Sequence, residues 1–227
     1  MFKDKGLIIG MVITILLIVG GVFLMSRDTG NSPQEDKKIS TDILVSEGAN
    51  ITSGISDDNY LPASTSAQVT LVEFGDYECP ACTIYHTLVK QLLFDLSGQV
   101  NYVFRNYPLN YHSNSLISTY AVEAAGLQGK YWQMHDKVYE TSDEWADSSD
   151  ANSIFVVYAN DLGLDAEKFR VDMDSDIVKN KVQADINDGD LVKLTATPTF
   201  FVNGVKIEKL NGNYSDFKKI ISDQLYK

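Results

Sequence analysis

The chain has 227 residues, with 31 acidic and 19 basic side chains, a formal net charge of −12 and only two cysteines. Outside residues 1–25 the balance is 17 basic to 30 acidic residues. No basic surplus exists to hold phosphates, so nucleic acid is excluded as a partner. Two cysteines allow one disulfide within a molecule and exclude a multi-disulfide scaffold.

The N-terminal segment has the length and composition of a membrane span. Lys3 and Lys5 precede an uncharged run, Gly6 to Met25, which is long enough to cross the hydrocarbon core as a helix. The lysines favour an N-terminus in the cytoplasm, and the end of the run is a poor cleavage site. We expect residues 1–25 to be an uncleaved anchor; a cleaved signal peptide is the alternative. Either places the remainder outside the cytoplasm, where disulfides persist.

The next segment, residues 26–57, is polar and rich in Ser, Asp, Gly and Asn. We expect a tether here, with one short strand at residues 42–45. Such a flexible chain reaches roughly 30–35 Å. Residues 58–227 are enough for a sizeable core in one folding unit.

The two cysteines form one motif, Cys79-Pro80-Ala81-Cys82. An apolar run predicts a strand at 68–74 before the motif, and apolar residues at helical spacing predict a helix after it. The first turn of a helix has unpaired N–H groups and partial positive charge, which stabilise a thiolate. Pro80 suits this turn because it lacks an N–H. We therefore expect Cys79 to attack disulfides and Cys82, one turn deeper, to resolve the mixed disulfide.

Two structural interpretations compete with a redox role. A structural staple closing so short a loop would constrain the unfolded chain little. A zinc site would need two of His86, His112 and His135, whose spacing matches no finger pattern. We expect neither a metal nor a cofactor. Two aspartate-rich stretches, 172–176 and 185–190, do not complete a calcium loop; we expect them to be solvated helix caps and faces.

Further strands are predicted at 99–105, 199–203 and 205–208, the last two joined by a hairpin at Asn203-Gly204. Ser215 is expected to cap a final helix.

Between residues 113 and 190 the pattern is helical throughout. A stripe of Phe155, Tyr158, Ala159 and Leu162 ends at Gly163, and Asp165 is expected to cap the next helix. The sequence thus predicts an α/β core interrupted by a helical insert.

Four segments also carry a resemblance to a known family. They are Val72–Cys82, Val103–Leu109, Gln128–Asp136 and Thr197–Gly204. Over residues 58–227 the chain resembles the DsbA-like thiol–disulfide oxidoreductases of the thioredoxin superfamily. The resemblance implies a thioredoxin fold with a helical insertion at about 113–190, here preceded by the N-terminal transmembrane helix.

The resemblance also implies roles for three further residues. Thr197-Pro198 matches the cis-proline loop that faces the cysteines and pairs with the substrate backbone; an ordinary trans proline is the alternative. Glu73 matches an acidic group beneath the active site that exchanges protons with Cys82; the alternative is a glutamate exposed at a strand edge.

The sequence departs from the family pattern between the cysteines. Strongly oxidising members often have Pro-His there, whereas this chain has Pro80-Ala81. Alanine cannot stabilise the Cys79 thiolate through its side chain, so we expect a milder oxidant, by tens of millivolts at roughly 30 mV per pKa unit. Ala196 also replaces a common glycine, without a clear consequence.

Four aromatic residues in or near the insert are candidates for lining a peptide groove. They are Tyr107, Tyr111, Tyr131 and Trp132. The alternative is that they belong to the core.

These observations predict a membrane-anchored, extracytoplasmic thiol–disulfide oxidoreductase, an oxidase of exported proteins. Its expected substrates are reduced or unfolded exported proteins. The resemblance implies reoxidation by a quinone-linked membrane partner of the DsbB or vitamin K epoxide reductase (VKOR) type. No dimerisation domain is recognisable, so we expect a monomer. A reductase or isomerase on the same fold is the nearest alternative; a tethered chaperone and a metal carrier are more distant ones.

Overall fold

The computed structural model describes residues 49–50 and 67–226. The anchor expected at 1–25 and the strand expected at 42–45 lie outside these residues. Within the described residues, no helix combines the length and apolarity needed to cross a membrane.

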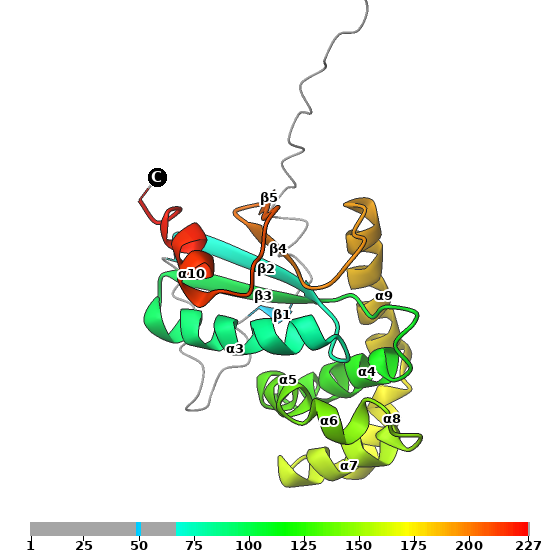
Figure 1. The fold of residues 1–227 in the computed structure, drawn as a ribbon. Coiled ribbons are helices and arrows are strands. Elements are labelled where there is room, and N and C mark those ends of the chain that lie inside the picture. The colour runs from blue at the N-terminus through cyan, green and yellow to red at the C-terminus, as the bar shows by residue number, and fades with distance from the viewer. Residues whose placement is uncertain (1–48, 51–66, 227) are drawn as a thin grey trace, which may run out of the picture. The chain divides into compact units, whose positions relative to one another are not determined.

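A five-stranded sheet in the order β1-β3-β2-β4-β5 lies at the centre of the fold (Figure 1). β2 and β3 are parallel, whereas β1 pairs antiparallel with β3, β4 with β2 and β5 with β4. The strands are β1 (Ala49–Asn50), β2 (Val69–Gly75), β3 (Val100–Asn106), β4 (Thr199–Val202) and β5 (Val205–Lys206). The four strands expected from the sequence are confirmed within two residues at each end.

The central strand β2 is buried on both faces. The alternation of its side chains decides which of them face the large core cluster. Val69 and Leu71 belong to the large core cluster, whereas Val72 and Phe74 belong to a smaller cluster. Because side chains alternate along a strand, Glu73 shares the face of Leu71. That face is the one on which the large core lies.

Helix α3 (Pro80–Asp95) begins at the cysteine motif. Cys79 is its N-cap residue and Pro80 its first residue, as the sequence predicts. The buried positions are Cys82, Tyr85, His86, Val89 and Leu92. This spacing is that of one helical face, so the packing that forms the helix also buries Cys82.

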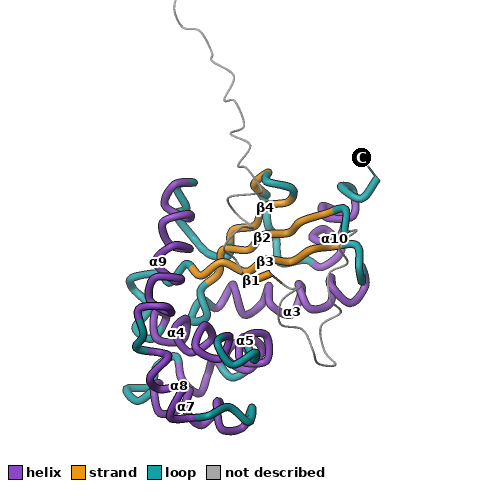
Figure 2. Tube along the Cα trace, turned by 180° about the vertical axis from the view of Figure 1, so that it is seen from behind, coloured by secondary structure: helices purple, strands orange, loops and turns teal. Residues whose placement is uncertain are grey.

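Helices fill the chain between β3 and β4 and gather at one end of the sheet in both views (Figures 1 and 2). They are α4 (Ser115–Gly126), α5 (Tyr131–Glu140), α6 (Ser142–Trp145), α7 (Ala151–Asp161), α8 (Ala166–Met173) and α9 (Asp176–Leu191). The fold is therefore a thioredoxin-like α/β fold with a helical insertion. Gly163 after α7 has a φ of 73°, and Asp165 caps α8 through two backbone N–H groups, both as expected.

The second aspartate-rich stretch corrects one expectation. Asp185 on α9 is fully buried and accepts a hydrogen bond from Arg105 of β3 at 2.7 Å. It also accepts from the backbone and side chain of Asn106, and from Lys181. A fully buried arginine needs such a partner. This residue is thus not part of a solvated face: it joins the insert to the sheet.

The final helix, α10 (Tyr214–Ser222), shows a second correction. Its N-cap is Asn213 and not Ser215. The Asn213 side chain accepts from the N–H groups of Ser215 and Asp216, so the Ser215 hydroxyl donates to Asn213 instead. The hairpin before it turns at Asn203 and Gly204, with φ of 50° and 81°, as the sequence predicts.

Asp185→Asn is expected to lower the free energy of unfolding by about 3 kcal/mol, because it removes the nearer of the two carboxylates that pair with the buried Arg105 charge and leaves Asp188 at 3.5 Å. Chemical denaturation followed by circular dichroism measures this. Asp161→Asn on α7 is the matched control: its exposed ion pair with Lys137 predicts a loss below about 1 kcal/mol. Equal losses in the two variants would contradict the assignment.

Candidate active site

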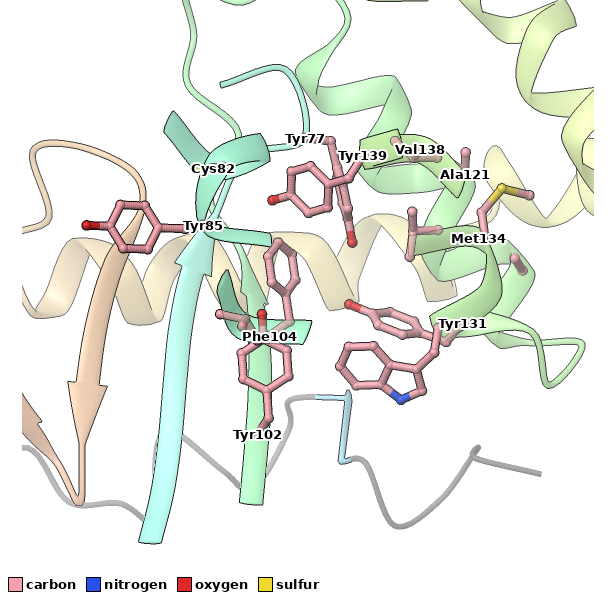
Figure 3. Packing of buried hydrophobic residues seen from close by; sticks show 14 of the residues in the cluster. Tyr77, Cys82, Tyr85, Tyr102, Phe104, Ala121, Tyr131, Met134, Val138 and Tyr139 are labelled. Carbon is pink, nitrogen blue, oxygen red and sulfur yellow. The ribbon is translucent and has the colours of Figure 1, made fainter. Parts of the chain in front are cut away.

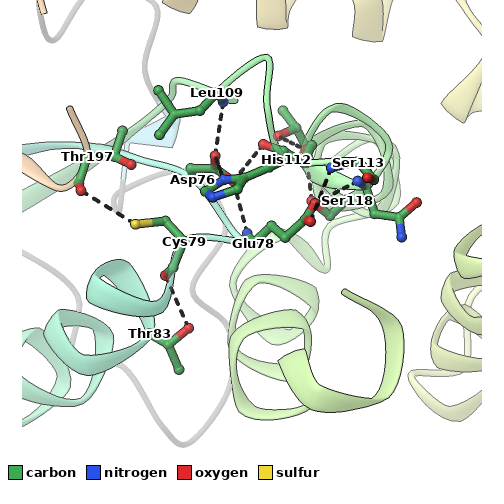
Figure 4. A network of polar contacts seen from close by, with 12 residues as sticks. Asp76, Glu78, Cys79, Thr83, Leu109, His112, Ser113, Ser118 and Thr197 are labelled. Carbon is green, nitrogen blue, oxygen red and sulfur yellow. Dashed lines mark hydrogen bonds and ion pairs between the residues drawn. The ribbon is translucent and has the colours of Figure 1, made fainter. Parts of the chain in front are cut away.

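The two cysteines lie at the start of α3, and both are buried. Cys79 is 7% exposed and Cys82 is fully buried, and both are free thiols. The Cys79 N–H donates to the Asp76 carbonyl at 3.1 Å, and its thiol donates to the Thr197 carbonyl at 3.4 Å (Figure 4). The fold thus brings the motif against a loop 118 residues away in the sequence.

The surroundings of Cys79 favour its thiolate. A hydrogen bond from the Cys82 thiol lowers the pKa of Cys79 to about 5, with further help from Thr197 and the N–H groups of Cys82 and Ala81, against the opposing effect of burial. The N–H groups of Ala81 and Cys82 are among the unpaired groups of the first helical turn. Cys79 can therefore act as a nucleophile at neutral pH.

The surroundings of Cys82 favour its thiol. Burial raises the pKa of Cys82 well above its ordinary value, and the hydrogen bond to Cys79 and the charges of Glu73 and Cys79 raise it further. A thiolate on one sulfur and a thiol on the other let the first attack an external disulfide while the second stays protonated.

The loop opposite the motif has the geometry expected from the sequence. The Thr197–Pro198 peptide bond is cis, and Thr197 is 8% exposed. Thr199 donates from its hydroxyl to the Ala196 carbonyl at 2.8 Å, within the same loop. The chain then enters β4, which pairs with β2. This pairing holds the loop beside the cysteines.

Glu73 is buried beneath the motif, 1% exposed, so the alternative of an exposed strand-edge glutamate is wrong. Its Oε2 accepts a hydrogen bond from the Tyr102 hydroxyl at 2.6 Å, whereas its Oε1 has no partner. Burial raises the pKa of Glu73 to about 8, the hydrogen bond from Tyr102 opposes the shift, and the charge of Cys79 adds to it. A carboxyl group with this pKa can give or take a proton near neutral pH.

Asp76 and Glu78 fix the loop that leads into the motif (Figure 4). Fully buried Asp76 accepts from the N–H groups of Glu78 and Leu109 and from the Ser115 hydroxyl. One of its oxygens also lies 2.7 Å from Nδ1 of His112. The motif is therefore attached to the insert on its N-terminal side.

Glu78, directly before Cys79, caps the insert's first helix. Its carboxylate accepts from the N–H groups of Ser113 and Asn114 at the start of α4. The N-cap residue Asn114 makes no side-chain cap, since its amide donates to the carbonyls of Trp145, Ala146 and Ser148. Sequence reasoning missed both acids, because no local pattern links the motif to a helix start 35 residues later.

The described residues include one group with the composition of a metal site. Donor atoms of His86, His135 and Asp136 lie within 4.8 Å of one another. The Lys90 ammonium, however, lies 3.0 Å from Asp136 Oδ2. Burial and the Lys90 charge lower the pKa of His86 to about 3. The same positive charge would oppose a metal cation, so we assign these groups to the packing of α3 on α5.

The four aromatic candidates for a peptide groove differ in their burial. Tyr131 and Trp132 are buried core residues, which favours the alternative interpretation, and Tyr111 is 71% exposed. The ring of Tyr107 packs edge-on against Phe74. A groove of about 790 Å³ lies elsewhere, lined by residues of α4, α7 and α8.

Comparisons with known proteins agree with this geometry. A family model described as thioredoxin matches residues 63–223. The structure is similar to BdbD from Bacillus subtilis in its oxidised form, with a TM-score of 0.65 and 24% identity over 73% of this chain and 91% of that chain. A thioredoxin-like oxidoreductase from Silicibacter pomeroyi gives a TM-score of 0.64 and 23% identity, covering 82% and 98%. Wolbachia pipientis alpha-DsbA1 gives a TM-score of 0.63 and 20% identity, and the match covers 76% of this chain and 92% of that chain.

Curated relatives match a segment of much longer chains. The chain is 34% identical over 160 residues to Na⁺/H⁺ antiporter NhaA 1 of Salinispora arenicola, covering 70% of this chain and 23% of the relative. It is 35% identical over 149 residues to Na⁺/H⁺ antiporter NhaA 3 of Salinispora tropica, covering 65% of this chain and 22% of the relative. The chain thus spans less than a quarter of the length of these relatives.

Alkylation of the reduced protein by iodoacetamide, followed by peptide mass spectrometry across pH, measures the two thiols separately. Cys79 is expected to react with a midpoint near pH 5, while Cys82 stays unmodified at neutral pH. Thr197→Val removes the side-chain hydroxyl that helps to lower the Cys79 pKa, so it is expected to move the midpoint upward. A wild-type midpoint at about 8.5, the value of a free cysteine, would contradict the assigned electrostatics.

Proposed function

We propose that this chain, which belongs to the thioredoxin family, is a DsbA-like thiol–disulfide oxidoreductase that exchanges disulfides with protein substrates through Cys79 and Cys82; the similar folds of BdbD and alpha-DsbA1 support this. One observation carries the proposal. The thiolate-favouring sulfur of Cys79 lies at a helix start, against the cis Thr197–Pro198 loop and in front of a buried thiol. We assign to Thr197 and Pro198 the binding of the substrate backbone, and to Glu73 the exchange of a proton with Cys82.

The proposed direction is oxidation of the substrate. A substrate thiolate attacks Cys79 in the Cys79–Cys82 disulfide, and Cys82 leaves with the electron pair as a thiolate that takes a proton. A second substrate thiolate then attacks the substrate sulfur of the mixed disulfide, and Cys79 leaves as a thiolate. The substrate gains a disulfide, and the protein ends with two reduced cysteines. A low pKa of Cys79 makes it a good leaving group, which supports this direction over reduction or isomerisation.

The cellular setting is part of the same proposal. The uncharged run from Gly6 to Met25 supports a membrane anchor, and the polar segment 26–57 supports a tether. The redox domain then works outside the cytoplasm, on reduced exported proteins. Its return to the disulfide form needs an oxidant, which we assign to a quinone-linked membrane protein of the DsbB or VKOR type.

Replacing each cysteine by serine tests the division of labour. Cys82→Ser is expected to accumulate a mixed disulfide with an unfolded substrate protein that carries a disulfide: the Cys79 thiolate attacks that disulfide, one substrate thiolate leaves, and no second thiol resolves the product. The product is seen as a thiol-sensitive band on a non-reducing gel. Cys79→Ser is expected to form none and to lose oxidase activity. If Cys79→Ser oxidised the substrate at the wild-type rate, the mechanism would be wrong. Unchanged activity of a double variant in preventing aggregation would favour a chaperone.

Ala81→His tests the departure from the family pattern. An imidazole beside the sulfur is expected to stabilise the thiolate and so raise the reduction potential by roughly 30 mV for each unit by which the Cys79 pKa falls. Equilibration with glutathione buffers measures the potential. Ala81→Leu, which adds bulk without a donor, is the control, and an equal shift in both variants would contradict the explanation.

A further inference from the structure

Tyr139 places an unpartnered hydroxyl beside the active site. The residue lies on α5 in the helical insert and is 1% exposed, and its hydroxyl has no hydrogen-bond partner. Its oxygen lies against the end of β2, 3.0 Å from where a Cβ on Gly75 would stand. A buried hydroxyl without a partner destabilises a fold, because it has lost its hydrogen bonds to water. Such a group calls for a partner that the reduced, resting site does not show.

The hydroxyl is turned toward the resolving cysteine. Figure 3 shows it pointing to the turn of α3 that carries Cys82. Burial raises the pKa of Tyr139 well above its ordinary value, and the charges of Cys82 and Glu73 raise it further. Tyr139 therefore stays protonated and interacts electrostatically with both groups.

A second unpartnered atom lies in the same buried region. Glu73 shares its face of β2 with Gly75, and its Oε1 has no partner because Tyr102 donates to Oε2 only. Cys82 in turn interacts electrostatically with Glu73. A donor that lacks an acceptor and a carboxyl oxygen that lacks a partner thus lie near one buried sulfur.

We propose that Tyr139 is a further catalytic residue, whose hydroxyl donates a hydrogen bond to the Cys82 sulfur whenever that sulfur is a thiolate, while Glu73 Oε1 exchanges the proton. The inference rests on the proposed function. It explains why the hydroxyl lacks a partner in the reduced form: its acceptor, the Cys82 thiolate, exists only during disulfide exchange.

The same groups transfer the Cys82 proton in both directions of disulfide exchange. When a substrate thiolate bonds to Cys79, the Cys79–Cys82 bond breaks and its electron pair passes to Cys82. Tyr139 donates to that thiolate, and the Glu73 carboxylic acid then protonates it. In reverse, the Glu73 carboxylate takes the proton of Cys82. The thiolate formed attacks Cys79, and the external sulfur leaves with the electron pair of the mixed disulfide.

Other titratable groups face the Cys82 sulfur or the Tyr139 ring from every packed element. Cys79 at the N-cap of α3 and Glu73 on β2 interact with Cys82; Tyr77 in the loop after β2, Tyr102 on β3, His86 on α3 and His135 on α5 interact with Tyr139. Burial lowers the pKa of both histidines, and the tyrosines Tyr77 and Tyr139 have raised pKa values. Glu73 and Cys82 are therefore the groups whose titration controls resolution.

Reaction of the reduced protein with excess 5,5′-dithiobis(2-nitrobenzoate) separates the two sulfurs in one stopped-flow record. Cys79 attacks first and releases one coloured thiolate. Cys82 then resolves the mixed disulfide and releases a second. Tyr139→Phe is expected to leave the first phase unchanged and to slow the second about tenfold, the effect of losing one hydrogen bond to a charged group. A factor of ten corresponds to about 1.4 kcal/mol.

Tyr131→Phe is the matched control. It removes a buried hydroxyl from the same helix, one that interacts with Glu123, Asp185 and Tyr77, and it is expected to change neither phase. The pH profile supplies a readout that packing alone would not move. Without its donor the Cys82 thiolate forms at higher pH, so the second phase of Tyr139→Phe is displaced upward in pH and its deficit shrinks as pH rises.

The outcomes separate the two proposals. A second phase of wild-type rate and pH profile in Tyr139→Phe would overturn the role of Tyr139 while leaving disulfide exchange intact. Equal slowing in Tyr139→Phe and Tyr131→Phe, with no shift in pH profile, would assign the hydroxyl to packing. A wild-type protein that released no second thiolate would overturn the proposed function itself.

Discussion

A negative charge held on a nearly buried sulfur is the constraint on which the rest of the site depends. Cys79 keeps that charge because the first turn of α3 supplies N–H groups and the Cys82 thiol donates to it, and the side chain of Thr197 across the sheet also lowers its pKa. The contribution of Thr197 depends on the strand pairing of β2 with β4, which brings the cis-proline loop to the motif. The sheet therefore positions the cis-proline loop against the Cys79 sulfur.

The helical insert is joined to the loop of the cysteine motif and to the sheet, in addition to covering the core. It receives the Glu78 carboxylate at the start of α4, and it is joined to β3 by the buried pair of Arg105 and Asp185. Through α5 it places aromatic rings behind the cysteines (Figure 3). Because Glu78 caps a helix, the negative charge next to Cys79 is paired with N–H groups and is not left free to oppose the thiolate.

Features that depend on neighbouring residues alone could be predicted from the sequence. The strand–turn–helix around Cys79, the turn at Asn203 and the cap at Asp165 follow from spacing and residue type, and the cis bond at Pro198 followed from the family resemblance. Apart from the contact of the Thr197 loop with the motif, which the resemblance implied, contacts between distant segments did not follow. The acidic run at 185–190 has the composition of a solvated surface, and only the tertiary fold shows that Arg105 buries Asp185. Tyr102 as the partner of Glu73 depends on strand register, which one sequence does not specify.

The reduction potential of the Cys79–Cys82 pair tests the central claim most directly, since it measures how far the protein stabilises the thiolate over the disulfide. A pKa of about 5 for Cys79 is two units below the thioredoxin value of about 7. At roughly 30 mV per unit, equilibration with glutathione should give about −210 mV, between thioredoxin at about −270 mV and DsbA at about −120 mV. A potential at or below about −270 mV would show that the thiolate is not stabilised and would contradict the oxidase.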